Sequence, residues 1–366
     1  MRSSFGFILI AMLTACGFHG GSSEVPVEVA YPADAAIDSG GAGDAGEQAQ
    51  DGGGGDGDGG SDVDAAVVDA APEPDAAPPV IVPDVSIVTP GVDISPQAEL
   101  IYCYYFRTSN TSELAIKKWT SHLSDGVRQL IVFFTLTDQQ TPQTLTTSPC
   151  GMASSGVGPA WTYSAVDTDA TAALPADDGT GRPVAQIIKA GQSGFILMHF
   201  RNSTDHVLHA NVELSAFAYD AGVQVTPASS FVTYNSGIDL PAAPSPAQPT
   251  TGAVTGNCRV APEAKFFAIS THTHKQSTHT FIRDGGTTVF DSRDWNHPGE
   301  MTWSTPPFFS FASGTLSYQC EYQNPNNFRI VSGDNVVTSE MCVTVGYYFP
   351  APDPTGHFCL NSQIIR

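Results

Sequence analysis

Short runs of β-branched and aromatic residues, separated by Gly, Pro, Asn and Asp, fill the chain from residue 80 onward and constrain its fold more than any other feature. A helical period is weak everywhere except over residues 112–123. Many short strands joined by loops predict an all-β fold, and the length suits two tandem jelly-roll β-sandwich domains. The runs expected to form strands are 80–88, 99–106, 127–136, 186–200, 210–219, 264–273, 278–283, 308–311, 315–322, 327–331 and 341–349.

The N-terminus has the features of an export signal. Arg2 precedes an apolar run over residues 5–13, which is too short to span a membrane. The run ends in Leu13-Thr14-Ala15-Cys16, which resembles a bacterial lipobox, so residues 1–16 are interpreted as a lipoprotein signal peptide with Cys16 as the lipidated residue. Acyl chains on one cysteine anchor a protein in a membrane. Gly17 favours the outer membrane, so we expect an outer-membrane lipoprotein of the bacterial cell envelope, facing the periplasm or the exterior.

Residues 17–84 are rich in Asp, Gly, Ala and Pro, and they contain 15 of the 37 acidic residues with no Lys or Arg. Such a segment buries too little apolar surface to offset its ordering entropy, so it is predicted to be a disordered linker. The net charge of −22 argues against a nucleic-acid partner, because phosphate contacts need clustered cations. The expected domains are 85–219 and 220–366, with the Pro-, Ala- and Thr-rich stretch 240–254 as an equally possible boundary. The protein is expected to be a monomer.

Seven cysteines are present, and six remain once Cys16 is set aside as the lipidated residue. An even number in an exported chain predicts three disulfides. Six cysteines allow 15 connectivities, so their spacing alone does not select the pairs. The six are Cys103, Cys150, Cys258, Cys320, Cys342 and Cys359.

Candidate metal ligands lie in the last hundred residues. His272 and His274 are two apart in a strand-like run, so both side chains are expected on one face. His279 is five residues further on, which places it on the opposite face of a regular strand. A surface or structural role is the alternative for such histidines. Met341 is next to Cys342, and a thioether beside two imidazoles selects Cu(I) over zinc, although methionine is more often core filler.

At this point the sequence resembles the copper type II, ascorbate-dependent monooxygenases, which include peptidylglycine α-hydroxylating and dopamine β-monooxygenases. The resemblance covers roughly residues 85–366 and is specific only from about residue 258 onward. Its pieces are His272-Thr273-His274, Arg283-Asp284-Gly285, the SYQCEYQNPN run around Cys320, Glu340-Met341-Cys342 and Tyr347-Tyr348-Phe349-Pro350, with fainter matches at 89–92, 101–103 and 196–200.

The resemblance implies two jelly-roll domains that hold one copper each, with ascorbate as the reductant and O₂-dependent hydroxylation of a substrate C–H bond as the reaction. His272, His274 and Met341 match the ligands of the O₂-binding copper. His199 matches one of three histidines at the electron-transfer copper. The disulfides it implies are Cys103–Cys150, Cys258–Cys359 and Cys320–Cys342.

The sequence departs from the family pattern at the second copper. Arg128 and Gln129 stand where the family has an adjacent His-His pair, and neither is a suitable copper ligand. His199 is therefore interpreted as a remnant of that site. The spare histidines that could rebuild it are His122, His206 and His209.

Three positions also depart from the pattern near the first copper and the substrate site. Ser277 replaces a glycine that usually follows the His-x-His motif. Ser270 and Val345 replace the Arg and Tyr that bind the carboxylate of glycine-extended peptides, so peptide amidation is not expected. The substrate would be an unidentified small molecule.

Three interpretations stay open at this stage. The protein is a monooxygenase with altered electron delivery, a single-site copper-binding or partner-binding protein without turnover, or a structural module without metal. Each differs in its expected copper content and its dependence on O₂ and ascorbate.

Overall fold

The computed structural model describes residues 82–147, 150 and 159–366. The predicted signal peptide, Cys16 and the linker up to residue 81 lie outside the described residues. The described residues form 25 strands and no helix, which confirms the all-β prediction. None of them belongs to a helix that could cross a bilayer. All the described residues belong to one compact unit. Within it, we call residues 85–219 the N-terminal half and residues 220–366 the C-terminal half.

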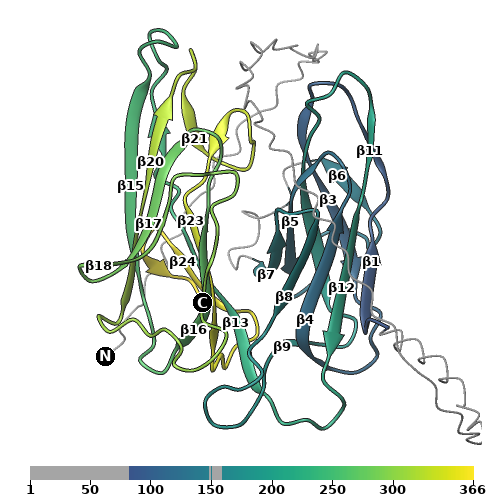
Figure 1. Ribbon diagram of the computed structural model, residues 1–366. Coiled ribbons are helices and arrows are strands. Elements are labelled where there is room, and N and C mark those ends of the chain that lie inside the picture. Colours follow the sequence, from purple (N-terminus) through teal and green to yellow (C-terminus); the bar gives the residue numbers. More distant parts are fainter. Residues whose placement is uncertain (1–81, 148–149, 151–158) are drawn as a thin grey trace, which may run out of the picture. The chain divides into compact units, whose positions relative to one another are not determined.

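The N-terminal half contains two packed sheets (Figure 1). One has the order β6-β3-β10-β5-β7, and the other has the order β1-β12-β4-β9 with β8 beside β4. Large apolar side chains such as Trp119 and Phe200 fill the space between them. The strands of the first sheet are β3 (Glu99–Arg107), β5 (Val127–Phe134), β6 (Leu145–Thr147), β7 (Ala160–Ala165) and β10 (Ser193–Arg201), and those of the second are β1 (Val85–Val88), β4 (Leu114–Leu123), β8 (Asp169–Ala173), β9 (Val184–Ile188) and β12 (Val212–Ala218).

The C-terminal half contains a four-stranded sheet of order β15-β20-β17-β18 that packs against β13, β16, β23 and β24. Strand β13 joins the halves, because its start pairs with β9 and its remainder pairs with β23. The bounds are β13 (Thr226–Tyr234), β15 (Thr250–Arg259), β16 (Lys265–His272), β17 (Ser277–Asp284), β18 (Thr287–Ser292), β19 (Met301–Thr302), β20 (Thr315–Asn324), β23 (Val343–Phe349), β24 (His357–Leu360) and β25 (Gln363–Ile364). Two small sheets complete the fold. One has two strands, β2 (Val92–Ile94) and β11 (Leu208–Ala210), and the other has three, β14 (Asp239–Leu240), β21 (Ile330–Ser332) and β22 (Ser339–Glu340).

The sheet that contains β10 is buried on both faces. Alternate residues of β3, β5 and β10 face the core of the N-terminal half, and the others pack on the C-terminal half in a separate apolar cluster. Ile131, Phe133 and Leu197 meet Met341 and Val343 in that cluster. Burial on both faces explains why these strands are continuous apolar runs in the sequence. Those side chains of β5 and β10 that face the C-terminal half can therefore reach its candidate ligands.

Several expected elements differ from the structure. The helix indicated by the spacing over residues 112–123 is not formed, because Leu114–Leu123 is strand β4. The run 186–200 is two strands, since Gly191 adopts a φ of 57° in the turn between β9 and β10. Residues 308–311 form only an isolated bridge, between Phe309 and Phe266. Strands β13 and β15 were not expected.

Three disulfides are formed, with Cα–Cα distances between 5.6 and 6.0 Å. They join the pairs that the resemblance implied, and all six cysteines are buried. The bonded pairs are Cys103–Cys150, Cys258–Cys359 and Cys320–Cys342.

Candidate metal centre

A cavity of about 20 Å³ lies between the two halves, with apolar side chains and six polar or sulfur-containing ones around it. This volume holds about one water molecule or one ion. Two of the six come from the N-terminal half and four from the C-terminal half. The six are Gln129, His199, His272, His274, Asp334 and Met341.

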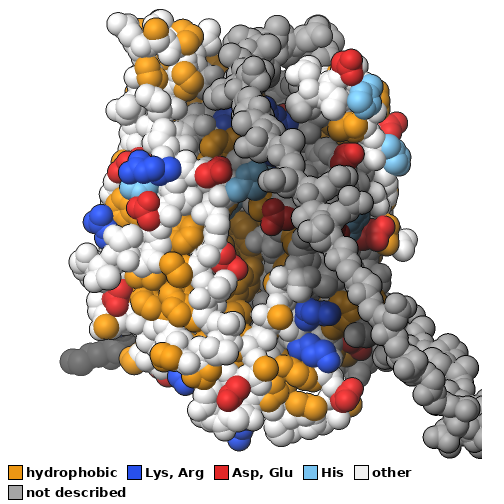
Figure 2. Space-filling view, in the orientation of Figure 1, with side chains coloured by type: hydrophobic (Ala, Val, Ile, Leu, Met, Phe, Trp, Pro, Cys, Tyr) orange, Lys and Arg blue, Asp and Glu red, His pale blue; other side chains and the backbone are white. Residues whose placement is uncertain are grey.

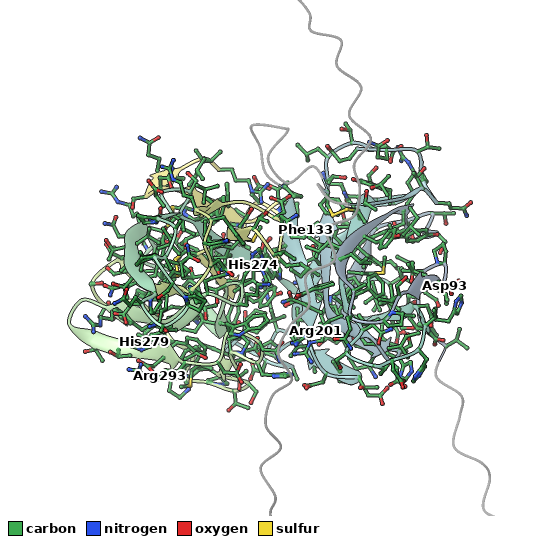
Figure 3. All side chains as sticks on the ribbon, turned by 90° about the horizontal axis from the view of Figure 1, so that it is seen from above. Asp93, Phe133, Arg201, His274, His279 and Arg293 are labelled. Atoms are coloured by element: carbon green, nitrogen blue, oxygen red, sulfur yellow. A yellow bond between two sulfur atoms is a disulfide. The ribbon has the colours of Figure 1, made fainter. Side chains whose placement is uncertain are left out.

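The two histidines of the His-x-His motif meet in this cavity, as their spacing predicted. His272 is the last residue of β16, and His274 follows two residues later. Their ring centroids are 5.6 Å apart, with the rings nearly perpendicular. Figure 3 shows His274 on the side of the C-terminal half that faces the N-terminal half. The pair offers two imidazoles to one small volume.

The ring of His274 is held in one tautomer. Its Nδ1 lies 2.9 Å from the carbonyl oxygen of Ser339, which accepts the proton of that nitrogen. The Nε2 lone pair is therefore left for a ligand. Burial lowers the pKa of His274 to about 4, so the ring is neutral at neutral pH. A neutral imidazole with one nitrogen bonded to a carbonyl is the usual state of a metal-ligating histidine.

His272 is also kept neutral. Burial, followed by the nearby rings of His274 and His199, lowers its pKa to about 3. Its Nδ1 lies 3.3 Å from the side-chain amide of Gln129, and its ring makes an edge contact with Trp161 at 5.6 Å. A glutamine amide can present either its NH₂ group or its oxygen, so Gln129 is compatible with either tautomer of His272.

Met341 is fixed by its neighbours on both sides. Cys342 is bonded to Cys320 in β20, and the carbonyl of Met341 accepts a 2.8 Å hydrogen bond from the hydroxyl of Tyr322. The side chain is 3% exposed. A thioether thus enters the same cavity as the two imidazoles at a constrained backbone position.

Glu340 ties the ligand-bearing segments together, a role that the sequence analysis did not assign. Its carboxylate accepts hydrogen bonds from the backbone N–H groups of His274 (2.8 Å), Gln276 (2.7 Å) and Met341 (3.1 Å). Burial raises the pKa of Glu340 to about 7, against the lowering effect of these donors. The sequence signals were its place beside Met341 and its membership of the Glu340-Met341-Cys342 piece of the resemblance.

His199 lines this same cavity. It lies on β10 opposite Gln129 of β5, and Arg128 occupies a register shift in the pairing of the two strands. Its Nε2 is 2.9 Å from Oε1 of Glu99. Burial alone would raise the pKa of Glu99, but the hydrogen bond with His199 and nearby positive charges lower it.

The spare histidines lie elsewhere, each beside a carboxylate. His122, His206 and His209 are exposed, and their partners are Asp169, Asp205 and Asp93 at 2.8, 3.1 and 2.8 Å. His279 pairs with Asp291 and Glu321 away from the cavity (Figure 3). It lies on β17, after the turn that follows β16, so the expectation based on one regular strand does not apply to it. Within the described part of the chain these side chains form no three-ligand group.

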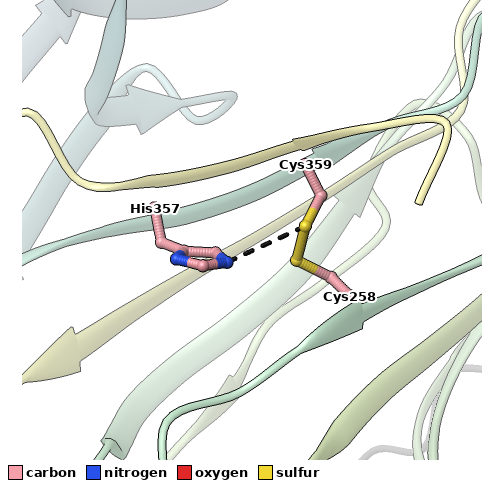
Figure 4. Close-up of side chains that lie close together, drawn as sticks. All are labelled: Cys258, His357 and Cys359. Carbon is pink, nitrogen blue, oxygen red and sulfur yellow. Dashed lines mark hydrogen bonds between the residues drawn. A yellow bond between two sulfur atoms is a disulfide. The ribbon is translucent and has the colours of Figure 1, made fainter. Parts of the chain in front are cut away.

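One cluster outside the cavity has the spacing of a metal site. In the described ranges, only Cys258, His357 and Cys359 form a group of three His, Cys, Asp or Glu side chains whose ligand atoms all lie within 4.8 Å of one another. The two sulfurs are bonded to each other, and His357 Nε2 lies 3.8 Å from Cys359 Sγ (Figure 4). Cysteine binds a metal as its thiolate, so this disulfide-bonded pair is not a metal site.

On the face seen in Figure 2, basic side chains are scattered and form no cluster, and hydrophobic side chains gather over the lower part. The sequence matches no protein-family model and no curated protein.

Proposed function

We propose that this protein binds a single Cu(I) ion through His272, His274 and Met341. One observation carries the proposal: two neutral imidazoles and one thioether enter a single cavity of about 20 Å³. The donor set is soft and uncharged, which suits Cu(I) better than Zn²⁺ or the harder divalent cations. The resemblance to copper monooxygenases, with the same three residues as ligands, supports the same metal.

The geometry supports copper binding better than hydroxylation. Substrate pockets measure roughly 300–1,000 Å³, far more than this cavity. Bound copper would supply O₂ chemistry and one-electron transfer, but a C–H substrate has no space beside it. The partners of Gln129 and His199 also give no support for a separate electron-transfer copper. The proposed role is therefore a copper-holding lipoprotein of the cell envelope, displayed on an acidic tether.

Copper content of purified protein tests this proposal. The wild type, His272→Ala, Met341→Ala and the exposed control His209→Ala would be loaded anaerobically with Cu(I) and titrated with a chromophoric Cu(I) chelator. We expect one Cu(I) per chain in the wild type and in His209→Ala, with a large loss of affinity in the other two. No copper in the wild type, or equal affinity in all four proteins, would overturn the proposal. Ascorbate-dependent O₂ consumption with a hydroxylated product would favour the monooxygenase interpretation instead.

A further inference from the structure

We infer that His199 of the N-terminal half is a fourth donor to the copper held by His272, His274 and Met341, so that one ion links the two halves. This inference rests on the proposed function. It assigns His199 to the first copper site, whereas the family pattern assigns it to a second one.

The position of His199 is the first argument. Its side chain is 7% exposed and lines the same small cavity as the other three donors. Residues Phe195 and Leu197 precede it on the same face of β10, and both belong to the apolar cluster that contains Met341. The C-terminal half covers this face of β10, so a side chain on it packs against the C-terminal half.

The second argument is the orientation of the ring. Glu99 on the neighbouring strand β3 holds Nε2 at 2.9 Å, and its own side chain is only 16% exposed. A histidine bonded to a carboxylate through one nitrogen presents the other to a metal, and the carboxylate makes that nitrogen a stronger donor. Glu99 is therefore a positioning residue, and Nδ1 of His199 is the nitrogen available to the ion.

The third argument is that the described residues offer His199 no other metal-binding group. The one three-ligand group with metal-binding spacing among the described residues, Cys258, His357 and Cys359, does not include it. Gln129, directly across from it on β5, contacts His272 of the C-terminal half. The imidazoles and the thioether that share a cavity with His199 are those of the proposed copper site, and Gln129 and Asp334 also line this cavity.

The ring nitrogens of His199, His272 and His274 are too far apart in this structure to coordinate one ion. Their ring nitrogens do not all lie within 4.8 Å of one another in the described chain. Ligation by His199 would need a movement of its ring or of the two halves toward each other. Copper should therefore stabilise the packing between the halves as well as the C-terminal half itself.

X-ray absorption spectroscopy of the full-length protein loaded with Cu(I) tests the inference. We expect three imidazole nitrogens and one sulfur in the wild type, and two nitrogens and one sulfur in His199→Ala. Glu99→Leu should weaken Cu(I) binding by about 10- to 100-fold, as outer-shell substitutions do, and Glu99→Gln should restore most of it because its amide oxygen still accepts the hydrogen bond. The control His209→Ala should match the wild type.

The outcomes separate this inference from the proposed function. A wild-type protein with no copper removes both. A wild-type site with two nitrogens and one sulfur, unchanged by His199→Ala, overturns the fourth donor alone. If His199→Ala fails to fold, the number of imidazoles in the wild-type spectrum still decides between three and two.

Discussion

The backbone N–H of His274 donates a 2.8 Å hydrogen bond to the carboxylate of Glu340, the residue that precedes Met341. The same carboxylate accepts hydrogen bonds from the backbone N–H groups of Gln276 and Met341. One buried side chain therefore fixes the distance between an imidazole ligand and the thioether ligand, although 66 residues separate His274 from Glu340.

Glu340→Gln should weaken both folding and copper binding. Three backbone N–H groups donate to the two carboxylate oxygens of Glu340. Glutamine has only one oxygen, so its NH₂ group must face at least one of these backbone donors. A buried donor left without an acceptor costs about 1–3 kcal/mol. Urea unfolding without copper and Cu(I) competition should both show the loss. Glu321→Gln is the matched control, because this carboxylate is 40% exposed and its ion pair with His279 should contribute little. Equal effects in the two variants would contradict the assigned role of Glu340.

The disulfides should separate stability from copper affinity. Cys320–Cys342 closes 22 residues and adjoins Met341, whereas Cys258–Cys359 closes 101 residues in the core of the C-terminal half. Removing Cys258–Cys359, which closes the longer loop, should lower the free energy of unfolding by about 4–5 kcal/mol, whereas removing Cys320–Cys342 should lower it by about 3 kcal/mol. Removing the shorter one should cost more Cu(I) affinity, since Met341 loses its anchor. Double Cys→Ala variants of each pair, compared by chemical unfolding and by Cu(I) competition, test whether the two orders are opposite. The same order in both measurements would show that Cys320–Cys342 has no specific effect on the site.

The strands that the sequence predicted well are those whose burial is simple. Glu99–Arg107 and Lys265–His272 are buried runs with few polar interruptions, so their β-branched and aromatic content was a sufficient signal. Strand β4 was not predicted because Lys117 lies at a register shift against β12. This shift leaves the buried residues Ile116 and Trp119 three positions apart. A β-bulge thus imitated a helical spacing. Strand β15 has only Val254 and Cys258 as sizeable apolar residues, so it gave almost no signal.

The candidate site divides in the same way. The pairing of His272 with His274 follows from local spacing, and the resemblance brought in Met341 from a distant segment. The place of His199 depends on apolar packing between the halves, which no local pattern reports. The sequence named Glu340 and Gln129 but did not predict their roles, because carboxylate and amide side chains are common and only their contacts distinguish them.

Acid should destabilise the fold through Asp178. Burial alone would raise the pKa of Asp178, but hydrogen bonds from Thr180, Thr226 and Arg182 lower it to about 2. A lowered pKa stabilises the folded state above the ordinary value near 4, and that contribution is lost as the pH falls from about 4 to about 2. The stability difference between wild type and Asp178→Asn should therefore be largest at pH 5 and shrink toward pH 2. Thr226→Val, which removes one of the donors, should show a smaller difference of the same kind. A constant difference across this range would contradict the assignment.

Replacing the thioether should change the metal preference of the site. Met341→His would put an imidazole where the thioether now lies beside His272 and His274, and an all-histidine ligand set is common for Zn²⁺. We expect Cu(I) affinity to fall and Zn²⁺ affinity to rise, because the soft donor that favours Cu(I) is gone. Competition with chromophoric chelators for each metal measures both changes. Met301→His is the control, since Met301 is 43% exposed on the short strand β19 and lies outside the cavity lining. If both variants shift equally, an added histidine at any position suffices and the sulfur of Met341 does not select the metal.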